Sequence, residues 1–539
     1  MAKSESKRIT EIIVILIGII LYFIGIGYNI NIYDEGIALV GADRISHGEI
    51  PYRDFWTMYT PLSYYINFVW MSLTGFTIIS VRILSSVFAV GIALIIYLNL
   101  KRYLSKVYAY SAYFFSIILL CLAPFNSKPI GMALFMSAIS IHLLIKAFSS
   151  ENNKAKKINV AFVLSGLLGG MTLLTRQDIG IYLLASVTIS AFLLWVIYIK
   201  SDRRIEELHT FSWRGILLYL TGFSVIVVPF IIVFLIKVPF AELYNQLYFV
   251  PFHIYPDYRS IHSFSVSSAV EEMKPVEIFR AIWFIIFRLT IAIPISTVIF
   301  MFDRKRLTEL RLKTFYLLFF SVMSVFLFAQ SSVRSDAEHT LPMVLFAVIS
   351  FFLIAYDEKQ KRIQTVVLAL IGLFILSYPV VTRIKTLSEY VSSTKSTYIE
   401  TSRAKGIRSP SEWAQNLDKA VTFIKSNTKP EDRIFVCTER NDKLVYNDVM
   451  FYFLAERLPA VKYHELHPGV TTEEKQQREM IESISKYNAK FVVRFTGNAG
   501  LEEPNKSSES SNVRLLDNYI DDNYFRVITY GDYWIFVRK

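Results

Sequence analysis

Long runs of hydrophobic residues, separated by short polar segments, fill the chain from its start to about residue 382. A helix needs about 20 consecutive apolar residues to cross the hydrocarbon core of a bilayer, and about eleven runs approach that length. They cover residues 12–28, 81–100, 107–123, 131–148, 158–174, 179–199, 215–238, 281–302, 315–330, 341–356 and 363–381. This pattern predicts a polytopic α-helical membrane domain over residues 1–382.

The segment between the first two runs, residues 29–80, is too long for a connector and too polar for a spanning helix. Its first half, "EGIALVGADRISHG", has apolar residues at helical spacing and predicts an amphipathic helix that ends at Gly48. Its second half is rich in Tyr and Trp, which is typical of segments at the membrane surface. An alternative is that residues 62–74 re-enter the membrane as a hairpin.

From residue 383 to residue 539 the composition is that of a soluble domain. Helices are predicted over residues 411–427, 447–458, 471–488 and 513–524, strands at "DRIFVC", "AVKYH" and "KFVVRF", and a closing hairpin around Gly531. This alternation predicts a small α/β domain. It has no nucleotide-binding glycine motif and no pair of nucleophile and base, so we expect it to recognise an acceptor or to pack over an active site.

Composition and charge support a membrane protein and predict its orientation. The 539 residues are 53% hydrophobic and only 19% charged, which is too apolar for a soluble protein of this size. Lys and Arg gather in the amino-terminal segment and in alternate loops, which the positive-inside rule assigns to the cytoplasm. The other loops and the carboxy-terminal domain are therefore expected outside. The net charge of +12 mainly reflects this topology, and no motif predicts nucleic-acid binding.

Three charged clusters fall at the outer ends of the predicted helices. The first contains Asp34, Glu35, Arg53 and Asp54, the second Arg176 and Asp178, and the third Arg334, Asp336, Glu338 and His339. Charge at a helix end beside lipid is costly unless it lines a wet cavity or pairs with a partner. Three such clusters on one face predict a functional site, and ordinary interfacial charge is the alternative.

The order of "YDEG" after the first run, then "GEIPYRDF", "YTPLSYY" and "VRILSS", resembles the GT-C class of membrane glycosyltransferases. The subgroup is glycosyltransferase family 39-like and contains bacterial protein mannosyltransferases and lipid A aminoarabinose transferases. "LLTRQDIG" and "RSDAEHTLP" add to the resemblance. It implies a GT-C fold in the bacterial cytoplasmic membrane, with a cytoplasmic amino terminus and an extracytoplasmic active site and carboxy-terminal domain. It also implies inverting transfer of a sugar from a polyprenyl-monophosphate donor to an envelope glycan, lipid or protein.

The resemblance also implies roles for the charged residues. Asp34 is the expected base for the acceptor hydroxyl, and Glu35 is expected to orient Asp34, bind a sugar hydroxyl or ligate a metal. The donor phosphate and the substrates are expected to meet a set of cationic and acidic side chains. This set consists of Arg53, Asp54, Arg176, Asp178, Arg334, Asp336 and His339.

The sequence departs from the family in the second outer loop, "APFNSKPIG", which has no carboxylate where several relatives carry a second acid. Asp178 either supplies that acid or caps its helix. Lys128 contacts phosphate or is simply interfacial. The aromatic segment 239–280 is either a flap over the donor lipid or an interfacial helix.

No cofactor and no obligatory metal are expected, although adjacent Asp and Glu leave Mg²⁺ or Mn²⁺ open. Two other functions also remain open, an envelope polysaccharide polymerase or ligase and a transporter of polyprenyl-linked lipids. A carboxylate pair so soon after the first helix favours the monophosphate-dependent transferase.

Overall fold

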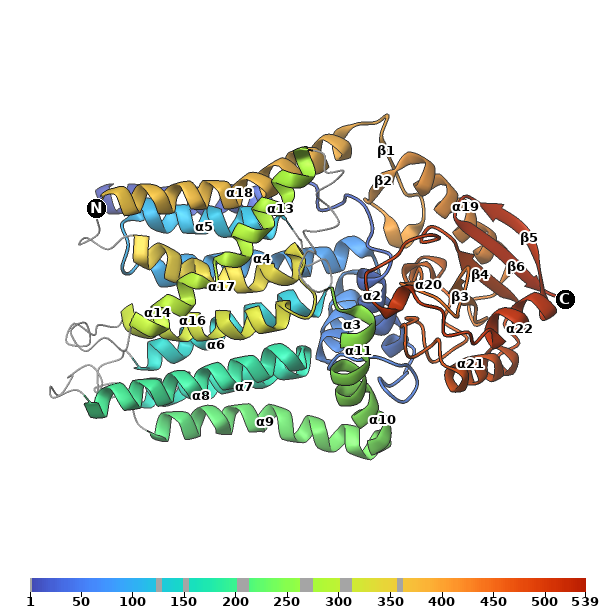
Figure 1. Ribbon diagram of the computed structural model, residues 1–539, viewed down its shortest axis with the longest axis horizontal. Helices are drawn as coiled ribbons and strands as arrows, with labels where there is room; N and C mark the ends of the chain where they lie inside the picture. Colours follow the sequence, from blue (N-terminus) through green and yellow to red (C-terminus); the bar gives the residue numbers. More distant parts are fainter. Residues whose placement is uncertain are drawn as a thin grey trace.

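The computed structural model describes residues 2–122, 128–148, 155–200, 213–261, 275–300, 313–355 and 362–539. A bundle of long helices forms one part of the molecule and an α/β domain forms the other (Figure 1). Short helices lie between the two parts, and the amino terminus is at the end of the bundle farthest from the α/β domain (Figure 1).

Each predicted hydrophobic run coincides with a helix of the bundle or, for residues 281–302, with two helices. They are α1 (Ala2–Phe23), α4 (Ile78–Leu100), α5 (Lys106–Leu120), α6 (Pro129–Phe148), α7 (Ala155–Thr175), α8 (Gln177–Lys200), α9 (Trp213–Lys237), α13 (Pro275–Leu289), α14 (Ala292–Phe300), α16 (Lys313–Ser331), α17 (Ala337–Ala355) and α18 (Arg362–Val391). Within the described ranges, 8 helices are long and apolar enough to span a bilayer. The count of eleven spans stays a prediction.

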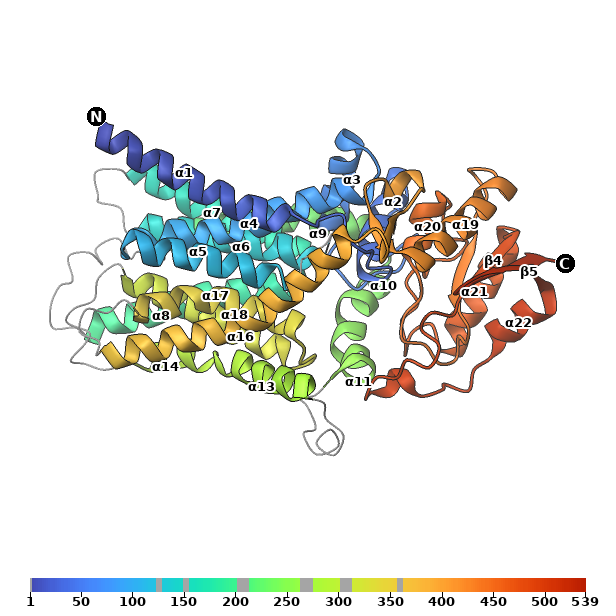
Figure 2. The ribbon, with the colours of Figure 1, turned by 90° about the horizontal axis from the view of Figure 1, so that it is seen from above.

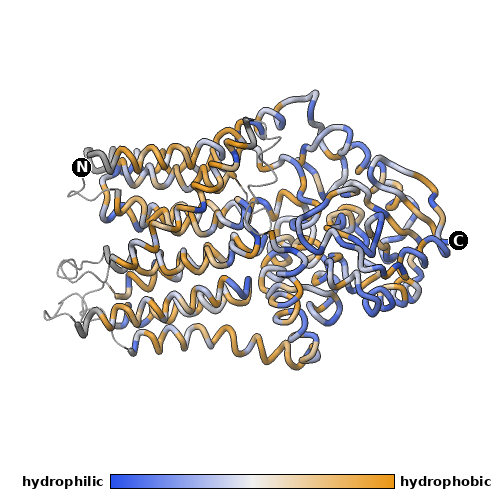
Figure 3. The backbone as a smooth tube through the Cα atoms, viewed as in Figure 1, coloured by the Kyte–Doolittle hydropathy of each residue, from blue (hydrophilic) through white to orange (hydrophobic). Residues whose placement is uncertain are grey.

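The bundle has the hydrophobic distribution of a membrane protein. Its helices are predominantly apolar along their length, whereas the α/β domain mixes apolar and polar residues (Figure 3). Helix α17 is mostly buried inside the bundle, while α9 and α18 leave most of their apolar side chains uncovered. Apolar side chains exposed in this way are stable in lipid and not in water. The chain is therefore an integral membrane protein.

Short helices form a layer between the bundle and the α/β domain (Figure 2). They include α2 (Asp34–Ser46), α3 (Leu62–Thr74), α10 (Phe240–Tyr244), the π-helix η3 (Asn245–Ile254) and α11 (Tyr255–Arg259). Residues 62–74 form the single helix α3, so the alternative of a re-entrant hairpin is wrong. The helix predicted before Gly48 is confirmed as α2. Its residues 35–44 are all buried, because α2 lies against both α3 and the α/β domain.

The carboxy-terminal part is an α/β domain with a four-stranded sheet in the order β3-β4-β6-β5. Strands β3 (Phe435–Thr438) and β4 (Phe491–Phe495) are parallel, and β6 (Tyr533–Arg538) is antiparallel to β4 and to β5 (Tyr524–Tyr530). The helices are α19 (Ser411–Asn427), α20 (Met450–Ala455), α21 (Glu474–Lys486) and α22 (Leu515–Asn523), and a small hairpin joins β1 (Ser396–Tyr398) to β2 (Arg408–Pro410).

Two details of this domain differ from the sequence expectation. Helix α18 continues to Val391, past the boundary expected between residues 382 and 383, because polar residues extend the helix beyond its apolar part. The segment "AVKYH", residues 460–464, was expected to be extended but forms no strand. It instead leads into a loop that packs on the first outer segment, where Trp56 lies beside Tyr463.

A buried ion pair holds α2 on the bundle. Arg82 of α4 donates to both carboxylate oxygens of Glu35, at 2.7 and 2.8 Å, and both side chains are at most 1% exposed. Arg82 also donates to the backbone oxygens of Ile26 and Asn29, which fixes the chain between α1 and α2. On its other side, α2 approaches the α/β domain so closely that a Cβ atom at Gly36 would lie 2.5 Å from the backbone nitrogen of Met450.

Replacing Glu35 by Ala is expected to destabilise the protein by about 3 to 5 kcal/mol, because it leaves the buried guanidinium of Arg82 without its countercharge. Thermal unfolding of the purified protein in detergent measures this effect. Arg53→Ala is the matched control, because Arg53 pairs with Asp54 at the surface, where an ion pair contributes less than about 1 kcal/mol. Equal melting temperatures for Glu35→Ala and the wild type would contradict a structural role for the pair.

Candidate active site

A cavity of about 670 Å³ lies where the bundle, the short helices and the α/β domain meet. Its walls come from the ends of α6, α8 and α17 that lie nearest the α/β domain, from α2 and α11, and from three loops of the α/β domain, which contribute Tyr446, His467 and Glu503. The residues singled out from the sequence that line it are Asp34, Lys128, Arg176, Asp178, Arg334, Asp336, Glu338 and His339. The three charged clusters thus converge on one cavity: the second and third contribute all of their residues, and the first contributes only Asp34.

Asp34 begins helix α2 and projects into this cavity. Its backbone amide donates to Asn31 Oδ1 at 2.9 Å, and Asn31 Nδ2 donates to Asp34 Oδ2 at 3.2 Å, so Asn31 fixes both the helix start and the carboxylate. Burial opposes ionisation here, but Lys128 and Asn31 outweigh it and lower the pKa of Asp34. An ionised carboxylate that remains 43% exposed to the cavity can accept a proton from a bound hydroxyl group.

Lys128 lies between two carboxylates from different parts of the chain. Its Nζ is 3.0 Å from Asp34 Oδ2 and also contacts Glu338 at the start of α17. Burial alone lowers the pKa of Lys128, but these two negative charges reverse the effect and raise it. Lys128 is therefore a fixed cation inside the cavity and not an interfacial residue.

Arg176 and Asp178 form a local pair between α7 and α8. Arg176 Nε donates to Asp178 Oδ1 at 2.9 Å, and the guanidinium lies 5.8 Å from the centre of the Tyr59 ring. Asp178 Oδ1 also accepts from the backbone amide of Ile179 at 2.8 Å. The carboxylate thus orients Arg176 and the first turn of α8, and it does not contact Asp34.

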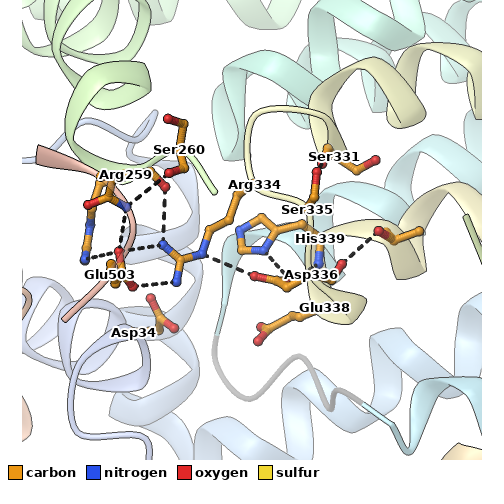
Figure 4. A network of polar contacts seen from close by, with 12 residues as sticks. Asp34, Arg259, Ser260, Ser331, Arg334, Ser335, Asp336, Glu338, His339 and Glu503 are labelled. Carbon is orange, nitrogen blue, oxygen red and sulfur yellow. Dashed lines mark hydrogen bonds and ion pairs between the residues drawn. The ribbon is translucent and has the colours of Figure 1, made fainter. Parts of the chain in front are cut away.

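Arg334, Asp336 and His339 form a second local group at the start of α17 (Figure 4). Asp336 Oδ1 lies 2.8 Å from His339 Nδ1 and accepts from the His339 backbone amide at 2.9 Å. Burial opposes ionisation of Asp336, but these contacts with His339 dominate and lower its pKa to about 2. Arg334 Nε donates to the other oxygen of Asp336 at 3.2 Å, so the carboxylate holds both the guanidinium of Arg334 and the imidazole of His339 in place.

A loop of the α/β domain reaches the same group (Figure 4). Glu503 accepts from Arg334 Nη2 at 2.9 Å and from Arg334 Nη1 at 3.3 Å. Its carboxylate also lies 3.7 Å from the guanidinium of Arg259 in α11. The guanidinium of Arg259 in turn lies 5.6 Å from the centre of the Tyr33 ring, and Tyr33 directly precedes Asp34 in the sequence.

A second loop of the α/β domain, residues 463–469, packs against the cavity wall. His467 lines the cavity between Trp56 and Tyr255, each with its ring centre 5.8 Å from the imidazole. Glu465 is 0% exposed, and neither of its carboxyl oxygens has a hydrogen-bond partner among the described residues. Burial, with a smaller contribution from Asp34, raises the pKa of Glu465 to about 8.

Three residues expected in the site lie elsewhere. Glu35 is buried against Arg82 and does not line the cavity. Arg53 and Asp54 are partly exposed, pair with each other at 2.7 Å and also lie outside the cavity lining. Of the charged residues in the segment 29–80 that were expected in the site, only Asp34 lines the cavity, together with Asn31 and several aromatic and aliphatic side chains.

Sequence reasoning gave no role to Glu465, His467 or Glu503, and it considered Arg259 only as part of the aromatic segment 239–280. None of them follows a motif, and the two glutamates lie in loops of a domain more than 400 residues from Asp34 in the sequence. The run "HELHPG", which follows the predicted strand "AVKYH", is the one local signal, because it places a glutamate between two histidines. In the ranges the structure describes, no three His, Cys, Asp or Glu side chains are grouped so that they could hold a metal ion.

The overall fold is similar to those of two solved membrane enzymes. ArnT from Cupriavidus metallidurans, bound to undecaprenyl phosphate, is 12% identical, with a TM-score of 0.53 over 97% of both chains. The oligosaccharyltransferase AglB from Archaeoglobus fulgidus, in complex with an inhibitory peptide and a dolichol-phosphate, is 10% identical, with a TM-score of 0.51 over 91% of this chain and 70% of that one. No protein-family model and no curated protein matches the sequence. These likenesses confirm the predicted GT-C fold with its carboxy-terminal α/β domain.

The raised pKa of Glu465 predicts a pH-dependent stability. Between the ordinary value of 4.5 and about 8, the folded protein binds one proton more than the unfolded chain at this position. The free energy of unfolding therefore falls as the pH rises through this range, and the loss due to Glu465 is complete above about pH 8. Glu465→Gln is expected to raise the melting temperature at pH 8.5 by about 2 °C or more, and by less at pH 5. The exposed Glu474→Gln is the control, and the same shift at both pH values would contradict the assignment.

Proposed function

We propose that the protein is an inverting glycosyltransferase that moves a sugar from a polyprenyl-monophosphate donor to an acceptor outside the cytoplasmic membrane. The observation that carries the proposal is that one cavity combines the ionised carboxylate of Asp34 with four cationic side chains, from Lys128, Arg176, Arg259 and Arg334. The cavity lies where an apolar bundle meets a polar domain. A lipid-linked phosphate needs this arrangement, because its chain stays in hydrocarbon while its head group requires countercharges.

The proposed reaction is a single displacement at the anomeric carbon. The acceptor hydroxyl oxygen forms a bond to this carbon as the bond from the carbon to the phosphate oxygen breaks, which inverts the configuration. The hydroxyl proton passes to Asp34. The bond electrons leave with the polyprenyl phosphate, whose negative charge the cations of the cavity stabilise. Lys128 keeps Asp34 ionised between turnovers by lowering its pKa.

The orientation in the membrane is part of the proposal. The amino terminus of α1 lies at the far end of the bundle from the cavity (Figure 1). At that end Lys101, which follows α4, pairs with Glu11 of α1 at 2.7 Å. Basic residues near this end favour its cytoplasmic location, which leaves the cavity and the α/β domain outside. ArnT and AglB, whose structures hold polyprenyl phosphates, support the donor class. The acceptor is an envelope glycan, lipid or protein.

Asp34→Asn is expected to lower transfer by about a hundredfold or more, because the amide keeps the shape of the side chain and cannot accept the proton. Transfer is measured in proteoliposomes from a panel of radiolabelled polyprenyl-phosphate sugars. Asp54→Asn is the matched control, because Asp54 lies in the same outer segment but outside the cavity. Equal activity of Asp34→Asn and the wild type would exclude Asp34 as the base. If the wild type transferred no sugar from any donor, the polymerase or transporter alternatives would be favoured.

Transfer is expected to persist in the presence of a chelator such as EDTA. The reason is that the ammonium group of Lys128 already bridges the carboxylates of Asp34 and Glu338, where a divalent cation would otherwise be needed to balance them. Lys128→Met is expected to lower activity by about tenfold or more, because it removes this cation and its effect on Asp34. Loss of wild-type activity in EDTA, with recovery on adding Mn²⁺ or Mg²⁺, would contradict the expectation.

A further inference from the structure

The cations that line the cavity already have carboxylate partners. Arg176 pairs with Asp178, Lys128 with Asp34 and Glu338, and Arg334 with Asp336. Arg334 and Arg259 additionally share Glu503. Arg176 donates to Asp178 through Nε, whereas Arg334 donates through Nε to Asp336 and through both terminal nitrogens to Glu503. A phosphate that binds the two terminal nitrogens of Arg334 must therefore take the place of Glu503.

Among the carboxylates that pair with the arginines of the cavity, Glu503 is distant from its partners in the sequence. Asp178 and Asp336 are two residues from the arginines that they bind, so they turn with them and orient them. Glu503 is 169 residues away from Arg334 and belongs to the loop of residues 498–512 between β4 and α22. Its two oxygens each face Arg334, as the two oxygens of a phosphate group would.

The loop around Glu503 is attached to the outer side of the cavity by a few polar contacts. Asn505 Nδ2 donates to Glu503 Oε2 at 3.0 Å and to the backbone oxygen of Ser260 at 3.1 Å. Lys506 pairs with Asp257 of α11 at 2.7 Å, and both of those side chains are more than half exposed. Exposed pairs of this kind contribute less than about 1 kcal/mol, so this pair adds little to the cost of moving Glu503 away from the cavity.

The charge of Glu503 matches that of the ligand it would replace. Burial opposes its ionisation, but hydrogen bonds from Arg334 and Asn505 lower its pKa, so the side chain is a carboxylate at neutral pH. A donor phosphodiester also carries one negative charge, so the exchange leaves the net charge of the cavity unchanged. The product phosphate carries about −1.5 to −2 at pH 7 and would be held more strongly than the donor.

We infer that Glu503 is an internal competitor for the donor phosphate. It occupies the pair Arg259 and Arg334 when the site is empty, the phosphate displaces it, and its return helps to expel the product phosphate. The inference rests on the proposed function, because it takes the phosphate of a polyprenyl carrier as the ligand of these arginines. Glu503 therefore sets donor affinity and product release without contacting the reacting carbon, and it couples phosphate binding to a movement of the loop 498–512.

Binding of undecaprenyl phosphate to the full-length protein in detergent tests this inference without relying on turnover. Calorimetric titration is expected to show about tenfold tighter binding to Glu503→Gln than to the wild type, because the amide no longer competes for the two arginines. Glu502→Gln is the matched control. Glu502 is the preceding residue, its side chain is 67% exposed, and it pairs with Lys443 outside the cavity lining. The Glu502→Gln variant is expected to bind undecaprenyl phosphate with the same affinity as the wild type.

A second variant and a second measurement complete the test. Asn505→Ala removes one contact that holds Glu503 in place, and it is expected to shift affinity in the same direction by a smaller factor. It also serves as the test variant if Glu503→Gln does not fold. Hydrogen exchange of residues 498–512 in the wild type is expected to become faster when undecaprenyl phosphate is added, because the loop loses its contact with Arg334.

The outcomes separate this inference from the proposed function. Tighter binding by Glu503→Gln, with unchanged binding by Glu502→Gln, supports the competition. Wild-type binding with equal or weaker binding by Glu503→Gln and Asn505→Ala would overturn the competition and leave the transferase proposal intact. No binding of undecaprenyl phosphate by any of these proteins would overturn both. Unchanged or slower exchange of the loop on ligand addition would exclude the coupled movement.

Discussion

Hydrocarbon does not solvate charge, and this constraint determines where chemistry takes place in this protein. The interior of the bundle is filled by apolar side chains, and the charged groups gather where one end of the bundle meets the short helices and the α/β domain. A charge at that depth is stable only with a partner or with access to water, and each charged group of the cavity has one or the other. The result is a polar cavity directly beside the layer in which a lipid carrier would lie.

The same constraint explains why the site consists of ion pairs rather than of isolated charges. Asp34 keeps its charge because Lys128 and Asn31 offset the cost of its burial, and Asp336 does so through His339 and Arg334. Glu465 has no such partner, and its pKa is raised instead. A site built in this way can bind an anionic ligand by exchange of partners, which costs less than stripping water from unpaired cations.

Contacts between the two parts of the molecule give the cavity its final shape. The buried pair of Glu35 and Arg82 sets the position of α2, and the absence of a side chain at Gly36 allows the α/β domain to lie directly on that helix. Asp43 of the same helix pairs with Arg403, and Arg44 contacts the backbone of Val461. The domain thereby brings Glu503 and His467 to the cavity, so it completes the site rather than merely covering it.

Local pattern was sufficient for much of the fold. Apolar runs marked the helices of the bundle, because a spanning helix needs a hydrophobic length that few other structures require. Arg176 pairs with Asp178 and Asp336 with His339, which are contacts between residues two or three apart at a helix start. The expected roles of Glu35, Arg53 and Asp54 did not match their positions, because sequence proximity to Asp34 says nothing about which way a side chain faces. What the sequence alone determined was therefore a membrane protein with charge at its helix ends. Only the tertiary structure decided that Lys128, Arg259, His467 and Glu503 share a cavity with Asp34, because these contacts join segments far apart in the chain and depend on how the two parts pack.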